Sequence, residues 1–244
     1  MSQQQLIYGI HPVQEALTSD AVIDRVFVEK GKTGLDEIRK QCQEQEIPVL
    51  VVPSFKMDRL TRKNHQGVVA IVSPVEFALL DEVVTRVFEK GEVPLVLVLD
   101  GVTDVRNFGA IARTAECAGV HALVIPQRNA ASINEDAIKT SSGALMRIPV
   151  CREKSLRRSM EDLQNFGLKI VAVTEKGTDS LFDTEMDGPL ALIMGAEDTG
   201  VSNELIRMSD SLAKIPMDGV TSSLNVSVAC GVALFESVRQ RSLK

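Results

Sequence analysis

Three stretches of the chain combine glycine with side chains that can hold a polar ligand. Guanidinium groups bind phosphate, carboxylates accept hydrogen bonds, and hydroxyl and amide groups bind neutral polar partners. If the fold brings the three stretches together, we expect these residues to share one ligand site. The residues are Asn107 and Arg113, then Glu197 between Gly195 and Gly200, and last Ser223 and Asn225.

Each stretch also has a structural interpretation that needs no ligand. Arg113 can pair with a nearby carboxylate, because a guanidinium beside an apolar helix face needs an anionic partner. Glu197 can be that partner, or it can belong to a loop that leads to a helix capped by Ser202. Ser223 and Asn225 can each cap the last helix, since both residue types are favoured there. A single stretch leaves these alternatives open.

The glycine pattern argues against one familiar nucleotide site. Residues 101–119 lack the GxGxxG fingerprint, and Asp104 and Arg106 stand where a pyrophosphate would need bare backbone. A Rossmann-type oxidoreductase is therefore a poor fit. In the last helix, Gly231 costs about 1 kcal/mol relative to alanine. This cost indicates that another chain element comes close to that position.

Five apolar runs in the second half of the chain read as buried strands separated by helices. Such a pattern predicts a parallel sheet covered on both faces, with ligands beyond the carboxyl ends of the strands. The three polar stretches follow three of these runs. The predicted strands are 95–100, 121–126, 168–174, 190–195 and 212–217.

The front of the chain forms a separate, smaller α/β pattern. Strands are predicted over 23–30, 48–53 and 67–73, and a helix over 34–47. A charged amphipathic stretch follows and predicts a linker helix. The expected organisation is a small domain over 1–75, a linker over 76–91 and a larger domain over 92–244.

Composition sets further bounds. The 244 residues carry a net charge of −6, and charges interrupt every apolar run, so neither a membrane span nor a secretory signal is expected. The four cysteines, which are far apart, predict buried reduced thiols in a cytoplasmic protein and no metal site. Two short basic clusters, 56–63 and 152–158, permit an RNA partner despite the acidic balance.

The three polar stretches together resemble the motifs of the SpoU family of RNA ribose 2′-O-methyltransferases, in the knotted SPOUT class. The resemblance covers most of residues 92–244, although Val105 stands where the family usually has proline, and GAEDTG replaces a commoner GsEgxG. The front stretches IYGIHPVQEAL and RKNHQGVVAIV resemble the substrate-binding domain that precedes the catalytic domain in many members. The three motifs are LDGVTDVRNFGAIARTA, LIMGAEDTGVSNEL and IPMDGVTSSLNVSVACGVALFE.

This resemblance implies a C-terminal trefoil knot and S-adenosylmethionine as cofactor. It assigns the cofactor pocket to Gly195, Gly200, Ile215 and Leu224. It also implies that Asn107 and Glu197 orient Arg113, which grips a phosphate or acts as base, while Ser223 and Asn225 hydrogen-bond the ribose. We favour the phosphate role, because free arginine titrates too high to be an easy base. His11 and His65, inside the front stretches, are expected to be structural or to contact RNA.

The resemblance also implies a partner and an assembly. We expect a homodimer that methylates a guanosine of 23S rRNA in the peptidyl-transferase loop, with Arg59, Arg62 and Lys63 of the front domain contacting the RNA. A transfer-RNA methyltransferase is the alternative within the class. A non-catalytic RNA-binding SPOUT protein is the alternative outside it, and the presence of Arg113 and Asn225 argues against that one.

Overall fold

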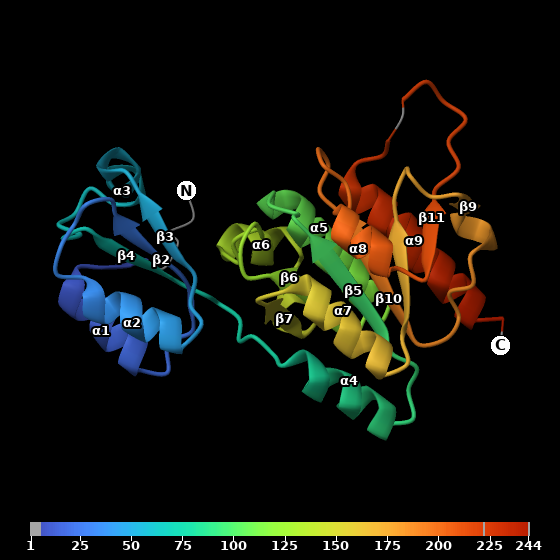
Figure 1. Cartoon of the computed structure of the whole chain (residues 1–244), viewed down its shortest axis with the longest axis horizontal. Coiled ribbons are helices and arrows are strands. Elements are labelled where there is room, and N and C mark those ends of the chain that lie inside the picture. The colour runs from blue at the N-terminus through green and yellow to red at the C-terminus, as the bar shows by residue number, and fades with distance from the viewer. Residues whose placement is uncertain (1–5, 222, 244) are drawn as a thin grey trace. The chain divides into compact units, whose positions relative to one another are not determined.

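The computed structural model describes residues 6–221 and 223–243. They form two compact units: one holds the chain up to residue 76 together with 133–135, and the other holds the remainder (Figure 1). The first boundary lies one residue beyond the predicted end of the front domain. Helix α4 (Leu80–Glu89), expected as a linker, buries Leu80 and Val84 in the core of the second unit and therefore belongs to it.

The first unit is a four-stranded sheet covered by helices. Its order is β1-β4-β2-β3; β4 is antiparallel to both neighbours, and β2 and β3 are parallel. Helices α1 and α2 cover one face and α3 lies on the other (Figure 1). The strands are β1 (Leu6–Tyr8), β2 (Ile23–Glu29), β3 (Val49–Val52) and β4 (Val68–Val72), and the helices are α1 (Ile10–Thr18), α2 (Asp36–Glu44) and α3 (Ser54–Leu60).

The second unit contains a seven-stranded sheet in the order β7-β6-β5-β10-β8-β11-β9, in which every pairing is parallel. This confirms the predicted parallel sheet. The strands are β5 (Leu95–Asp100), β6 (Ala122–Pro126), β7 (Val150–Glu153), β8 (Lys169–Val173), β9 (Asp179–Ser180), β10 (Leu190–Gly195) and β11 (Ser211–Lys214). The helices are α5 (Val105–Cys117), α6 (Glu135–Thr140), α7 (Leu156–Asn165), α8 (Asn203–Met208) and α9 (Val226–Arg241), with short 3-10 turns η1 (Ala144–Met146) and η2 (Leu181–Asp183).

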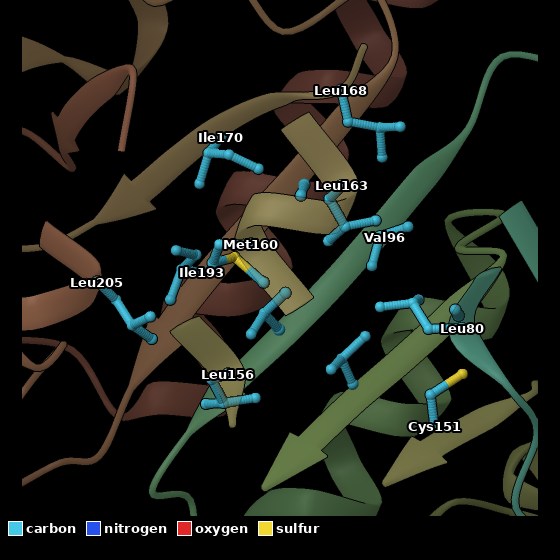
Figure 2. Packing of buried hydrophobic residues seen from close by; sticks show 14 of the residues in the cluster. Leu80, Val96, Cys151, Leu156, Met160, Leu163, Leu168, Ile170, Ile193 and Leu205 are labelled. Carbon is cyan, nitrogen blue, oxygen red and sulfur yellow. The ribbon is translucent and has the colours of Figure 1, made fainter. Parts of the chain in front are cut away.

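A hydrophobic core joins α4, α7 and α8 to one face of this sheet (Figure 2). Met160 and Leu163 of α7 are fully buried beside Ile170 and Ile193 of the strands. Helices α5 and α9 pack against each other, and α9 also contacts β10. Because helices cover both faces of the sheet, a ligand can reach its polar groups only at the edges formed by the strand ends.

Two sequence predictions need correction. The strand predicted over 212–217 ends at Lys214, because Pro216 has no N–H to donate to a ladder. Of the four cysteines expected to be buried, Cys117 is exposed on the last turn of α5.

None of the helices in the described ranges combines the length and the apolar character that a membrane crossing requires.

Candidate active site

The three polar stretches meet where the strand order of the large sheet reverses. Strands β5 and β10 are neighbours, and their last residues, Asp100 and Gly195, are register partners. From β5 the chain continues to β6 and β7 on one side, whereas β8 and β11 lie on the other side of β10. Ligand sites of open parallel sheets lie at such a reversal, beyond the carboxyl ends of the strands.

Asn225 connects the three stretches. Its Nδ2 donates to Oε1 of Glu197 at 2.5 Å and to Oδ1 of Asn107 at 3.1 Å. Its Oδ1 accepts from the N–H and the hydroxyl of Ser227, so Asn225 is also the N-cap of α9. The amide orientation is fixed by its partners, because Glu197 can only accept and the Ser227 N–H can only donate. The structural and the functional interpretation of Asn225 therefore both apply.

These four bonds use both donors of the Asn225 amide and both lone pairs of its oxygen. Asn225 thus has no hydrogen-bonding group left for a ribose, in contrast to the role that the family resemblance implies. The geometry instead makes it a positioning residue that holds the start of α9 against Glu197 and Asn107. The main-chain N–H of Val226, 3.4 Å from Oε1 of Glu197, adds to the same junction.

Glu197 lies in a tight turn that glycine makes possible. A Cβ placed on Gly195 would lie 2.1 Å from the carbonyl carbon of Gly200, so no other residue fits there without moving the backbone. Gly200 has φ +65° and donates its N–H to the carbonyl of Ala196 at 2.9 Å. The turn folds back over the end of β10 and presents Glu197 to the start of α9.

Two aspartates that the sequence analysis did not select hold the neighbouring loops. Oδ2 of Asp100 accepts from the N–H of Ser202 at 2.8 Å, which ties the end of β5 to the loop after β10. Asp104 caps α5 by accepting from the N–H groups of Arg106 and Asn107. Ser202 occupies the N-cap position of α8 without a side-chain cap bond. The sequence did offer a signal for Asp100, because a polar residue at the last position of an apolar strand can be expected to lie at the ligand-binding edge of the sheet.

Arg113 is not part of this hydrogen-bonded cluster. Its side chain is exposed on α5, and within the described part of the chain it makes no hydrogen bond or ion pair. Asn107 and Glu197 therefore bind Asn225 rather than orient Arg113 directly. Ser223 is likewise exposed and has no hydrogen-bond partner among the residues that the structure describes. Both side chains are available to a ligand.

The segment between β11 and α9 fits a ligand bound through the backbone. Of its described residues, 216–221, 223 and 224 make no main-chain hydrogen bond with the rest of the described chain. Ile215 and Leu224, at its two ends, are half-buried apolar residues. Free amide and carbonyl groups between two apolar side chains match the needs of a nucleoside that carries a sulfonium side chain, as in S-adenosylmethionine. Elsewhere in the described ranges, no three acidic, histidine or cysteine side chains gather as a metal site.

The far end of α9 is anchored by the half-buried guanidinium of Arg241. Arg241 donates to the carbonyls of Val93, Pro94 and Gly188 at 2.7 to 2.9 Å, which joins α9 to the segments preceding β5 and β10. Burial lowers the pKa of Arg241, and Asp187 opposes that shift. The helix is thus held at both ends, so its N-terminus has a defined position beside Glu197.

Comparison with known proteins shows to which family the chain belongs. Residues 94–235 match the model of the SpoU rRNA methylase family, and residues 6–78 match the model for RNA 2′-O ribose methyltransferase substrate binding. The chain belongs to the SpoU family. It is accordingly an S-adenosylmethionine-dependent RNA 2′-O-methyltransferase with a front substrate-binding domain, as the sequence motifs predicted.

Three relatives of this SpoU enzyme illustrate the match. It is 38% identical to the 23S rRNA (guanosine-2′-O-)-methyltransferase RlmB of Pseudomonas putida, over 100% of both chains. The crystal structure of the SpoU methyltransferase AviRb from Streptomyces viridochromogenes with AdoMet has a TM-score of 0.64 at 26% identity, covering 98% of this chain and 91% of the other. The A. aeolicus TrmH/SpoU tRNA modifying enzyme has a TM-score of 0.57 at 30% identity, covering 68% of this chain and 86% of that one.

Proposed function

We propose that this SpoU enzyme methylates the ribose 2′-hydroxyl of a guanosine in 23S rRNA, in the peptidyl-transferase loop. The observation that carries the proposal is the match to RlmB over the full length of both chains. The tRNA modifying enzyme of A. aeolicus covers only 68% of this chain. The front domain, which matches a substrate-binding model over 6–78, therefore favours ribosomal RNA over transfer RNA.

S-adenosylmethionine, when bound between Gly195, Gly200, Ile215 and Leu224, supplies the methyl group. The residues of the chain must then hold the ribose oxygen in line with it, and such positioning is a large part of catalysis. Ser223, whose hydroxyl has no partner among the described residues, hydrogen-bonds the ribose. Arg113 binds the adjacent phosphate, because a guanidinium can donate two parallel hydrogen bonds to phosphate and this side chain is exposed without a partner in the described chain.

Asn225, Glu197 and Asn107 act on the substrate indirectly in this proposal. Their hydrogen bonds fix the first turn of α9 against the loop after β10. Ser223 and Leu224 directly precede that turn, so a shift of the turn moves both the ribose contact and the cofactor contact. A misplacement of about 1 Å is enough to cost a large factor in rate.

We further propose that the enzyme is a homodimer and that its C-terminal segment forms a trefoil knot. Val228 and Phe235 of α9 are 52% and 49% exposed, although α9 packs on α5 and β10. A Cβ added at Gly231 would lie 3.6 Å from Cγ2 of Thr114 of α5 in the same chain, which is an ordinary contact distance. A dimer is therefore better tested by Phe235→Lys than by a substitution at Gly231. The knot is what the resemblance to the SPOUT class implies, and Gln240 and Ser237 of α9 bond to the 184–186 segment.

The substrate assignment is tested by methyl transfer in vitro. The purified enzyme, S-adenosylmethionine with a labelled methyl group, and unmodified 23S rRNA should give labelled RNA. Bulk transfer RNA should remain unlabelled under the same conditions. Label in transfer RNA alone would contradict the proposed substrate while leaving the enzyme class intact.

A further inference from the structure

Helix α3 of the front domain carries an exposed aromatic side chain. Phe55 is 55% exposed, in a chain that has eight phenylalanines, one tyrosine and no tryptophan. The helix does not need Phe55 for its attachment, because Met57 is fully buried and Leu60 packs against the same small core. Phe55 is not part of that core. Phe55 is therefore available to a partner outside the domain.

A cation lies over this ring. Cζ of Arg59 is 5.8 Å from the ring centroid of Phe55, one helical turn away. A second cation–aromatic pair involves Lys63, four residues after Arg59. Its Nζ is 5.5 Å from the ring centroid of Tyr8, the single tyrosine of the sequence. Arginine and aromatic side chains side by side are typical of surfaces on which nucleic-acid bases stack.

The positive charges around Phe55 are not neutralised. Within the described chain, the side chains of Lys56, Arg59, Arg62 and Lys63 make no hydrogen bond or ion pair with a carboxylate. The acidic residue of this segment, Asp58, faces His65 at 3.5 Å. Unpaired cations beside an exposed ring suit a partner that has both phosphate groups and flat bases.

Another lysine lies close to this surface. The main-chain N–H of Lys30 donates to the carbonyl of Val52 at 2.8 Å, two residues before α3 begins. Lys30 is exposed and, like the four cations of 56–63, has no carboxylate partner among the described residues. The positive charge thus extends from the helix to the turn that follows β2.

We propose that the α3 surface, formed by Phe55, Lys56, Arg59, Arg62 and Lys63, binds an unpaired RNA loop, with one base stacked on Phe55 and the flanking phosphates held by the cations. This inference rests on the proposed RNA substrate and specifies its form. A paired A-form helix hides the faces of its bases, whereas a loop can present them to an aromatic side chain. The α3 surface therefore selects unpaired nucleotides within the substrate.

The absence of tryptophan from the sequence allows a direct test with Phe55→Trp in the full-length protein. The probes are a hairpin RNA with a loop of about eight nucleotides, within the site sizes of single-strand binders, and a blunt duplex with the same stem. Both are end-labelled so that anisotropy reports binding. Stacking of a base on the introduced indole should quench and shift its emission when the hairpin is bound, and the duplex should leave it unchanged. The matched control is Phe182→Trp, since Phe182 is 49% exposed in the other unit.

Affinity variants complete the test. Phe55→Ala should weaken hairpin binding about 5- to 150-fold, the range for loss of one stacked base, without changing the salt dependence. Replacing Arg59, Arg62 and Lys63 together with alanine should weaken binding and flatten the salt dependence, because fewer counterions are released. The triple replacement of Lys154, Arg157 and Arg158, the second basic cluster, is the control and should have a smaller effect.

The outcomes separate the two proposals. Hairpin binding that leaves the emission of the Phe55→Trp variant unchanged, or that survives Phe55→Ala undiminished, would overturn the stacking role while leaving the RNA substrate in place. Equal affinity for duplex and hairpin would also overturn it. If neither RNA nor 23S rRNA binds to the wild-type enzyme, the proposed function fails as well.

Discussion

The Nδ2 atom of Asn225 lies 2.5 Å from Oε1 of Glu197, although the two positions are 28 residues apart along the chain. This bond joins the cap of α9 to the turn after β10, and the second Nδ2 hydrogen joins both to Asn107 at the start of α5. A single amide thus holds together the three segments that carry the family motifs. The effect of this bond on methyl transfer can be measured with one substitution that removes only the donors of Asn225 and another that removes the donors and the acceptor together.

Asn225→Asp keeps the oxygen that caps α9 but removes both donors and places a carboxylate against Glu197. We expect the helix to persist, since aspartate is as good a cap as asparagine, while methyl transfer falls by at least about 10-fold because the α9 start shifts. Asn225→Ala should lose the cap as well, at a cost of about 1 kcal/mol. Circular dichroism and single-turnover kinetics check this. Unchanged kinetics in Asn225→Asp would contradict the positioning role.

Arg113→Ala should lower methyl transfer strongly without affecting the fold, because the side chain is exposed and has no partner within the described chain. Arg106→Ala provides the control on the same helix. The affinity for S-adenosylmethionine, measured by calorimetry, should stay the same in both variants. Near-normal turnover of Arg113→Ala at saturating RNA and cofactor would remove Arg113 from the active site.

Gly195→Ala tests the close turn after β10. The added methyl group would collide with the backbone of Gly200 and Val201, so the turn must open. We expect a loss of about 1–3 kcal/mol of stability, which corresponds to several degrees in Tm, together with weaker cofactor binding. Gly188→Ala is the matched control, since a Cβ there has no neighbour within 4 Å. Equal melting temperatures for the two variants would contradict the geometry.

The strands and the location of the site could be read from the sequence to different extents. Continuous apolar runs such as 190–195 predicted buried parallel strands, and the polar residues after them predicted the site edge. The short strands β1, β7 and β9 and the helix α3 were missed, because such short elements carry too little periodicity. The partners of Asn225 were also beyond prediction, since one amide can cap a helix or bind a ligand, and only the fold decides which atoms meet.

The buried thiols predict a loss of stability at alkaline pH. Burial raises the pKa of Cys42 to about 11 and that of Cys230 to about 12, and burial with nearby carboxylates raises that of Cys151 to about 12. In the unfolded chain these thiols ionise near pH 8.5. Above about pH 8.5 these thiols ionise in the unfolded chain but not in the folded one, which favours unfolding. Their contribution to the free energy of unfolding is therefore complete below about pH 8.5 and is lost as pH rises toward about 11 to 12.

Urea unfolding below and above the ordinary thiol pKa, at about pH 8 and about pH 10.5, checks this. Cys230→Ala should be less stable than the wild type at the lower pH but should lose less stability between the two pH values. Groups that titrate in both proteins cancel in this comparison. The same loss in both proteins would show that Cys230 does not contribute to the pH dependence.

The most direct test of the account is a nucleoside map of 23S rRNA from cells that lack this enzyme. Mass spectrometry of RNase fragments should show one 2′-O-methylguanosine of the peptidyl-transferase loop missing. The wild-type gene should restore it, and the gene carrying Asn225→Asp should restore little of it. A 23S rRNA with all its 2′-O-methylguanosines in place, together with a ribose methyl group missing from a transfer RNA, would contradict the proposed substrate.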